Sequence, residues 1–138
     1  MNYLVDTNVL SELAKPLPAD GVLAWFHSNQ SQLYVSSVTI GEIRKGLELM
    51  PAGKRKESLK VWFKAICDTM EGRILSFNTA TARVWGQMVG SLEKKGIHLP
   101  TIDSQLAATA QRNGLTMVTR NVADFQNTGV KLLNPFAS

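Results

Sequence analysis

The stretch Tyr3-Leu4-Val5-Asp6-Thr7-Asn8-Val9-Leu10 contains the pattern on which the predicted fold rests. Its first three residues are apolar or aromatic and predict a short strand that ends at Asp6. Residues 7–15 then follow a helical pattern, which stops at Pro16 and Pro18 because proline lacks the backbone N–H that a helix interior needs. A strand that leads directly into a helix is the repeating unit of α/β proteins.

The remainder of the chain repeats this alternation of short apolar runs and longer helical patterns. Further strands are predicted at 33–35, 73–77, 115–119 and 131–133, and further helices at 20–28, 39–50, 54–70, 79–95 and 101–113. Strands separated by helices need crossover connections, which place helices on both faces of a parallel sheet. We therefore predict an α/β fold, a three-layer α/β/α sandwich with a mainly parallel sheet. The length of 138 residues predicts one domain over residues 1–138.

Composition excludes several classes of protein. Hydrophobic residues make up 44% and charged residues 19% of the chain, a balance typical of globular proteins and not of disordered ones. The single cysteine excludes an internal disulfide framework and a cysteine-rich zinc site. No apolar run approaches the roughly 20 residues that span a bilayer, and the N-terminus lacks a signal-peptide pattern. We therefore expect a cytoplasmic protein with no membrane partner.

The net charge of +4 is distributed unevenly. Seven basic residues lie between positions 44 and 64, opposed by Glu48 and Glu57 alone: Arg44, Lys45, Lys54, Arg55, Lys56, Lys60 and Lys64. A basic face indicates a polyanionic partner such as nucleic acid, although a solvated helix surface carries the same charges. Because phosphate contacts are mostly made by lysine and arginine, five of these residues are candidates for RNA-backbone contacts: Arg44, Lys45, Lys54, Arg55 and Lys56.

Four acidic residues stand where a strand ends or the next helix begins: Asp6, Glu42, Asp103 and Asp124. In parallel sheets the functional site lies beyond the carboxyl ends of the strands, so these residues can converge there. Two carboxylates about 4 Å apart repel by roughly 4 kcal/mol at an effective dielectric constant of 20, which favours protonation or a bound cation. Oxygen ligands without histidine or cysteine favour Mg²⁺ or Mn²⁺, metals that suit hydrolysis of phosphodiesters by activated water.

Helix capping is the alternative explanation for each of these acidic residues. The stretch 39–42, Thr-Ile-Gly-Glu, matches a capping box with Glu42 at its last position. Asp103 would follow a cap at Thr101, and Asn121 could cap a turn that contains Asp124. Capping accounts for the residues singly, but it does not explain four carboxylates at one edge.

The same residues carry a resemblance to a known family. The opening stretch 3–10 resembles the first motif of PIN-domain ribonucleases, and Ser37-Val38-Thr39-Ile40-Gly41-Glu42-Ile43 is similar to the second. Residues 101–110 match the third motif, and Thr119-Arg120-Asn121-Val122-Ala123-Asp124-Phe125 the fourth. The four motifs occur in order over essentially the whole chain. The chain length and the motif residues resemble those of the VapC-type toxins, including the FitB-like members.

This resemblance implies a PIN-domain fold and cleavage of RNA by a toxin that depends on Mg²⁺ or Mn²⁺. By residue match it implies an acidic quartet, in which Asp6, Asp103 and Asp124 ligate metal while Glu42 binds a second metal or orients water. It assigns supporting hydrogen bonds around these ligands to Asn8, Thr119 and Asn121. It also implies a VapB-type antitoxin that blocks the site and contacts DNA itself, so that the toxin meets DNA only indirectly, and a homodimer.

Three further features remain open at this level. Asn78 stands where related toxins often have aspartate, and it can cap the helix that begins at Thr79. His27 and His98 lie outside the four motifs, although His98 precedes the Asp103 helix and could touch substrate.

Two other functions compete with the ribonuclease. Asp6-Thr7-Asn8 resembles the start of a haloacid-dehalogenase-type phosphatase, a chemistry that needs a second aspartate at position 8 and would form an aspartyl-phosphate. A binding module would instead keep the acidic site, bind RNA and not cleave it in the presence of manganese.

Overall fold

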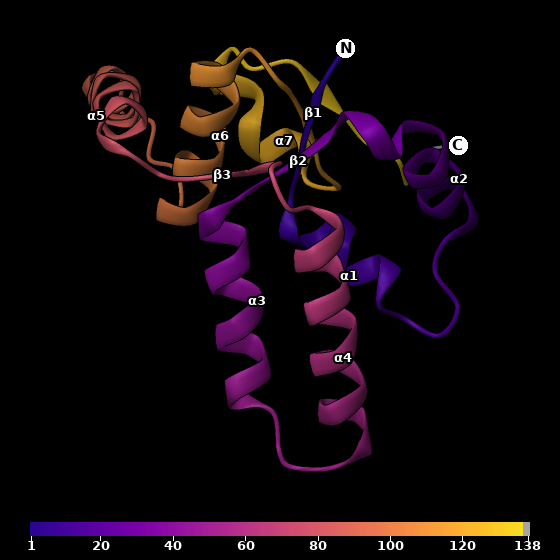
Figure 1. Ribbon diagram of the computed structural model, residues 1–138. Coiled ribbons are helices and arrows are strands. Elements are labelled where there is room, and N and C mark those ends of the chain that lie inside the picture. The colour runs from indigo at the N-terminus through magenta and orange to yellow at the C-terminus, as the bar shows by residue number, and fades with distance from the viewer. Residues whose placement is uncertain (137–138) are drawn as a thin grey trace.

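The computed structural model describes residues 1–136, and a five-stranded sheet forms its centre (Figure 1). The strands are β1 (Tyr3–Val5), β2 (Leu33–Ser36), β3 (Ile74–Leu75), β4 (Thr116–Val118) and β5 (Leu132–Leu133). Their spatial order is β3-β2-β1-β4-β5, and each neighbouring pair is parallel. The predicted parallel sheet is therefore confirmed. The first strand of the chain lies at its centre, so the end of β1 is enclosed by its neighbours.

The helices lie on both faces of this sheet. They are α1 (Thr7–Leu13), α2 (Asp20–Asn29), α3 (Ser37–Leu49), α4 (Lys54–Thr69), α5 (Thr79–Lys94), α6 (Thr101–Asn113) and α7 (Val122–Phe125). Short 3₁₀ turns cover Gln30–Gln32 and Gln126–Thr128. Figure 1 shows α5 and α6 on one side of the sheet and α1 and α2 on the other. This is the predicted α/β/α sandwich.

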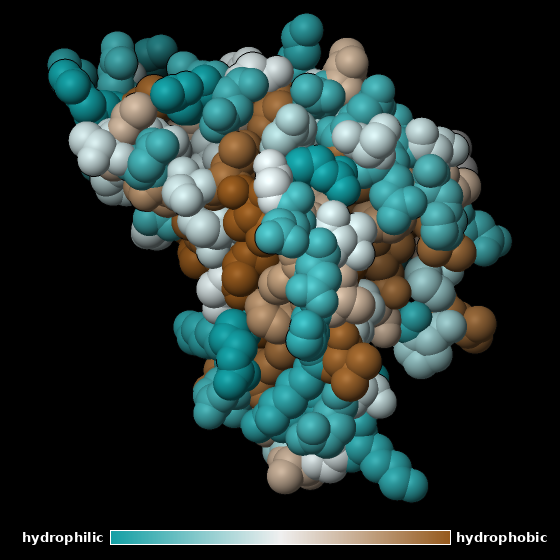
Figure 2. Space-filling model, viewed as in Figure 1, coloured by the Kyte–Doolittle hydropathy of each residue, from teal (hydrophilic) through white to brown (hydrophobic). Residues whose placement is uncertain are grey.

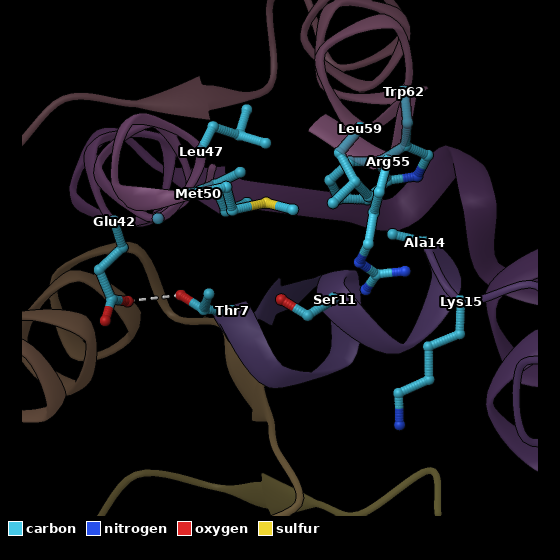
Figure 3. Close-up of a pocket in the computed structure, with 12 residues that line it drawn as sticks. Thr7, Ser11, Ala14, Lys15, Glu42, Leu47, Met50, Arg55, Leu59 and Trp62 are labelled. Atoms are coloured by element: carbon cyan, nitrogen blue, oxygen red, sulfur yellow. Dashed lines mark hydrogen bonds between the residues drawn. The ribbon is translucent and has the colours of Figure 1, made fainter. Parts of the chain in front are cut away.

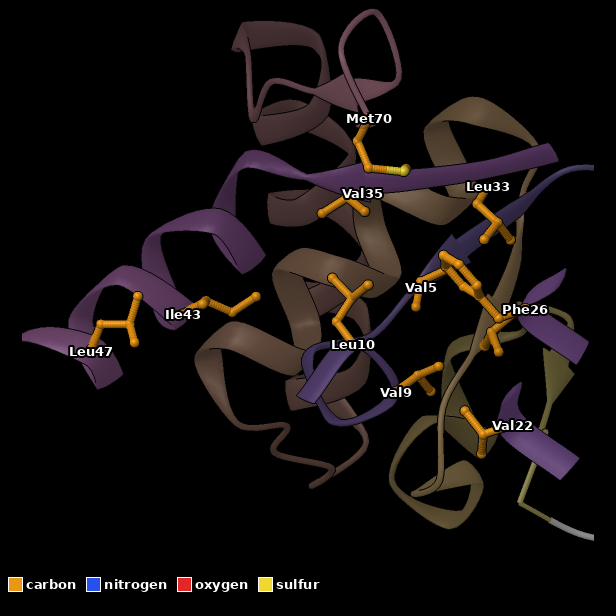
Figure 4. Packing of buried hydrophobic residues seen from close by; sticks show 11 residues of the cluster. Val5, Val9, Leu10, Val22, Phe26, Leu33, Val35, Ile43, Leu47 and Met70 are labelled. Atoms are coloured by element: carbon orange, nitrogen blue, oxygen red, sulfur yellow. The ribbon is translucent and has the colours of Figure 1, made fainter. Parts of the chain in front are cut away.

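Alternation of side chains along the strands produces two separate cores. Val5 of β1 belongs to the first core, whereas its neighbour Leu4 belongs to the second. In the first core, Val5 and Leu33 of the sheet lie with Val9 of α1 and Phe26 of α2 (Figure 4). The second core packs the opposite face against α5 and α6. Successive residues of a strand point to opposite faces, so each short strand serves both cores.

Helices α3 and α4 form a hairpin that extends away from the sheet (Figure 1). One side of α4 is apolar: Leu59, Trp62, Phe63 and Ile66 pack against the first core. No residue of α4 is fully buried, however, since the helix extends beyond the sheet and is covered on one side only. Figure 2 shows hydrophilic residues gathered at the lower end of this hairpin, beside hydrophobic ones.

Most predicted elements are present with shifted ends. The helix predicted at 39–50 begins two residues early, at Ser37, because the Ser36 hydroxyl accepts a 3.0 Å hydrogen bond from the Val38 N–H and caps it. The strand predicted at 73–77 shortens to two residues, and α7 was not predicted. Within residues 1–136, no helix has the combined length and apolar character required to cross a membrane.

Candidate active site

Asp6 follows β1 directly and is the N-cap of α1. Its Oδ1 accepts a 2.7 Å hydrogen bond from the Thr7 N–H, and its Oδ2 accepts one of 2.8 Å from the Thr119 hydroxyl. The carboxylate is buried, with 5% of the residue exposed. Burial raises the pKa of Asp6, as does the negative charge of Glu42, while the hydrogen bonds oppose this shift. Capping of α1 and a place at the carboxyl edge of the sheet therefore coincide in one residue.

Asn8 and Thr119 connect the ends of the two central strands. The parallel register pairs Val5 with Val118, so the residues that follow them, Asp6 and Thr119, emerge side by side. The Asn8 amide donates to Asp6 Oδ2 at 3.3 Å and to Thr119 Oγ1 at 3.2 Å. Thr119 Oγ1 also accepts a 3.0 Å bond from the Asn121 backbone N–H. The network immobilises the Asp6 carboxylate, and Asn121 takes part through its backbone.

Glu42 reaches the site from α3. Its Oε1 accepts a 2.5 Å hydrogen bond from the Thr7 hydroxyl, which Figure 3 shows bridging α3 and α1. Because α3 begins at Ser37, Glu42 lies in its second turn and does not cap it, so the capping-box interpretation of 39–42 is wrong. The Thr39 side chain is buried inside the protein and makes no hydrogen bond within residues 1–136.

Asp103 lies in the first turn of α6, which faces the same edge of the sheet. Its pKa is raised to about 6 by burial and then by the negative charges of Asp6, Asp124 and Glu42. Each of the other three carboxylates thus lies close enough to act on Asp103. Pro100, not Thr101, is the N-cap of α6, and no side chain caps this helix within the described residues.

Asp124 completes the group from α7, and its side chain is exposed to solvent. Asn121 is the N-cap residue of this short helix, but its side chain accepts no capping hydrogen bond; its carbonyl accepts a 3.0 Å bond from the Asp124 N–H instead. The four acidic residues therefore come from α1, α3, α6 and α7 and face one edge of the sheet.

The four carboxylates are suited to a metal ion by ligand type, but they are not spaced for direct coordination. All four donors are carboxylates, the ligand type that hard divalent cations prefer. Burial and the negative charges of the other three residues both raise the pKa of Asp103, and a bound cation would relieve the repulsion. Within residues 1–136, however, no three side chains of the histidine, cysteine, aspartate or glutamate type are spaced for direct coordination of one ion. An ion held by one or two of these carboxylates would complete its coordination with water.

A groove of about 360 Å³ extends from Glu42 along α1, between α3 and α4. Its walls are largely apolar, with Leu47, Met50 and Trp62 among them. Figure 3 shows Glu42 at one end and the cationic side chains of Lys15 and Arg55 at the other. The groove therefore connects the acidic group to a basic rim.

The five basic candidates do not form one patch. Arg55 lines the groove just described, whereas Lys45 lines a second groove beside Glu42 and Ile102. Arg44 pairs with Glu48 at 2.9 Å, and the Lys56 ammonium donates to the Met50 carbonyl at 3.2 Å. Lys54 is the first residue of α4 and is exposed.

Two residues near the acidic group were missed by sequence reasoning. Thr7 holds Glu42, and Glu12 of α1 is buried with two cations around it. The position of Thr7 beside Asp6 in the first motif was a usable signal. No local pattern marks Glu12, because its partners include Arg120, more than a hundred residues away.

Comparison with known proteins identifies the family. The model of the PIN domain matches residues 3–131. The chain belongs to the PIN-domain family. This PIN-domain protein is 33% identical over 135 residues to the VapC ribonuclease Y4jK of Sinorhizobium fredii, with 96% of each chain covered. It is 34% identical over 135 residues to the toxin FitB of Neisseria gonorrhoeae, covering 96% of this chain and 97% of that protein.

A solved structure agrees with the fold. The structure of FitAB bound to an IR36 DNA fragment superimposes with a TM-score of 0.91 at 33% identity, covering 99% of this chain and 96% of that one. The α/β/α arrangement predicted from the strand–helix alternation is therefore the PIN-domain fold, as the resemblance implied.

Proposed function

We propose that this PIN-domain protein is a metal-dependent endoribonuclease that acts as the toxin of a toxin–antitoxin pair. One observation carries the proposal: at one edge of the sheet, the negative charges of Asp6, Glu42 and Asp124, spread over more than a hundred residues of sequence, all act on Asp103. Relatives named as a VapC ribonuclease and a FitB toxin support the choice of RNA as substrate.

Asp6, Asp103 and Asp124 would hold Mg²⁺ or Mn²⁺. Glu42 would bind a second ion or orient a water molecule. Such an ion activates water and neutralises charge on the phosphate. The chain supplies the positioning. Asp6 is immobilised by Thr119 and Asn8, so its oxygens point to one place. The Asp103 side chain makes no such hydrogen bond within residues 1–136, and the pKa of its carboxyl is raised, so a bound cation would stabilise its charged form.

In this proposal Glu42 orients the water molecule that attacks the phosphate. Thr7 donates to one of its oxygens, Oε1, and thereby fixes the plane of the carboxylate. The second oxygen is then available to accept a proton from a water molecule beside the phosphate. Asn8, Thr119 and Asn121 support the site from behind by the hydrogen bonds already described.

The basic side chains of the α3–α4 hairpin would contact the RNA backbone. Arg55 and Lys45 are the best placed, because each lines a groove that also contains Glu42. Lys54 lies further along the hairpin, whereas Arg44 and Lys56 are partly engaged by Glu48 and the Met50 carbonyl. We expect these contacts to be independent of base identity.

The partner in this proposal is a VapB-type antitoxin, and the toxin itself forms a homodimer. A complex of FitAB with DNA is known for a relative of the same fold. We therefore place DNA contact with the antitoxin, and the complex in the cytoplasm, where RNA and promoter DNA are both accessible.

Cleavage of RNA by the purified protein in Mn²⁺ tests the function. Asp6→Asn and Asp103→Asn are each expected to abolish cleavage while circular dichroism shows an intact fold. A phosphatase of the haloacid-dehalogenase type would instead trap a phosphoryl group on Asp6, detectable by mass. A binding module would retain RNA at millimolar manganese without cutting it. Undiminished cleavage by both aspartate variants would refute the proposed site.

A further inference from the structure

Two cations beside Glu12 of α1 remain unused by the proposed function. The Lys15 ammonium lies 2.8 Å from Glu12 Oε1, and Arg120 Nη2 lies 3.8 Å from the same oxygen. Glu12 itself is nearly inaccessible, with 7% of its side chain exposed, whereas Lys15 and Arg120 retain 55% and 53%. A buried anion thus gathers two half-exposed cations at the surface.

Hydrogen bonds to both of its oxygens hold the Glu12 carboxylate in place. Its Oε2 accepts a 2.9 Å hydrogen bond from the Ala19 N–H at the start of α2. The bond from Lys15 lowers the pKa of Glu12, and the Ala19 amide acts in the same direction. With Glu12 ionised, the group of three carries a net charge of +1, and its exposed part is positive.

Arg120 is held in place by two further contacts. Its guanidinium lies over the Phe136 ring, 3.8 Å from the ring centroid, a cation–π arrangement. Its backbone N–H donates to Asn8 Oδ1 at 3.2 Å, and Asn8 is the residue that binds Asp6 and Thr119. Arg120 is therefore anchored directly beside the acidic group, with its charge directed to the neighbouring surface.

The geometry of α1 relates the two places. Asn8 and Glu12 are about one turn apart, so the backbone of Glu12, whose carboxylate the two cations contact, lies about 6 Å further along the helix axis than that of Asn8. That displacement is comparable to the step between phosphates of a single strand. A strand whose reacting phosphate lies at the four carboxylates also needs cations nearby, because those carboxylates repel its other phosphates.

We propose that Lys15 and Arg120, gathered by Glu12, form a phosphate-binding site for the RNA strand next to the acidic group. The inference rests on the proposed function and adds a contact beside those proposed for the α3–α4 hairpin. Lys15 also lines the groove that contains Arg55, so this site extends the basic rim across α1 (Figure 3). Contacts of this kind position the backbone and do not read bases.

Salt dependence of RNA binding tests the proposal. The full chain carrying Asp103→Asn, which does not cleave, is titrated with a short single-stranded oligoribonucleotide at several salt concentrations. Adding Lys15→Gln and Arg120→Gln is expected to reduce the slope of log K against log salt by about 0.7 for each lost phosphate contact. Lys94→Gln, at an exposed position on α5, is the matched control and leaves the slope unchanged.

Two further measurements separate binding from folding. In the cleaving protein the Lys15→Gln variant, whose native side chain is 55% exposed, is expected to raise KM with little change in kcat. Arg120→Lys keeps the charge and should retain most of the salt slope, whereas a purely structural arginine would not be replaced by lysine.

The outcomes distinguish this inference from the proposed function. An unchanged slope in the folded double variant, with the parent chain cleaving RNA in Mn²⁺, overturns the phosphate site alone. A parent chain that neither cleaves nor binds RNA overturns both. Variants that bind RNA normally but escape inhibition by the antitoxin would assign the two cations to an acidic protein segment and overturn the RNA site.

Discussion

The Thr7 hydroxyl donates a 2.5 Å hydrogen bond to the Glu42 carboxylate and so joins α1 to α3 across 35 positions of sequence. Thr7 also adjoins Asp6, whose carboxylate its backbone N–H binds at 2.7 Å. One residue therefore sets the positions of two carboxylates that repel each other. Four predictions follow from this arrangement and from its neighbours.

Thr7→Val is expected to reduce kcat for RNA cleavage about tenfold, since a hydrogen bond to a charged group contributes on the order of 1.5 kcal/mol. The isosteric change removes the hydroxyl that orients Glu42 and leaves the backbone N–H to Asp6. Initial rates at saturating RNA in Mn²⁺ measure the effect. Thr7→Ser keeps the donor and serves as the control; an undiminished rate in Thr7→Val, or an equal loss in Thr7→Ser, would contradict a role for the donated hydrogen bond.

The metal-free protein should lose stability as pH rises from about 4 to about 6. Asp103 has its pKa raised to about 6 in the folded protein, from 3.8 when unfolded, so the folded state binds the extra proton in that interval. The contribution is complete below pH 4 and lost above pH 6. Because Asp103 is partly exposed, we expect about 1 kcal/mol.

Asp103→Asn supplies the comparison that isolates this effect, because other carboxylates, Glu12 among them, titrate in the opposite sense. In EDTA the variant should match the parent near pH 4 and exceed its free energy of unfolding by about 1 kcal/mol at pH 7. Urea unfolding at both pH values measures the difference. A variant less stable than the parent at pH 7 would contradict repulsion among the carboxylates.

Mn²⁺ should raise the melting temperature of the wild-type protein more than that of Asp103→Asn. An ion that binds only the folded state stabilises it by about 2.7 kcal/mol at a hundred times its Kd. Differential scanning fluorimetry with increasing Mn²⁺ provides the measurement, with Ca²⁺-free buffer and the Lys94→Gln variant as references. Identical shifts in wild type and Asp103→Asn would place the ion elsewhere.

Asn78→Ala should lower the free energy of unfolding by about 1 kcal/mol and leave RNA cleavage unaffected. Asn78 Oδ1 accepts a 2.9 Å hydrogen bond from the Thr81 N–H and caps α5, which confirms the capping role predicted from the sequence. Asn78→Asp retains the acceptor and should restore stability. Loss of cleavage in a stable Asn78→Asp protein would indicate a role at the active site.

The carboxylates illustrate what could be predicted locally. Asp6 was placed at the end of a strand and at the start of a helix from eight residues alone, and the structure has it there. The start of α3 was misplaced because Ser36 and Thr39 are equally good caps in sequence; Ser36 is the last residue of β2, where it pairs with Leu75, and its side chain caps α3. Helix starts depend on where strand pairing stops, which distant residues determine.

The alternation of apolar runs, helix-breaking prolines and motif acids determined the fold class and the four candidate residues by itself, because local pattern controls which segments become strands and helices. Tertiary structure alone decided which side chains meet: Thr7 with Glu42, Thr119 with Asp6, and Lys15 and Arg120 with Glu12. Those contacts depend on strand order and register. Strand order and register are set by the need to bury the two hydrophobic cores at the same time. This requirement involves the whole chain and cannot be read from any single segment.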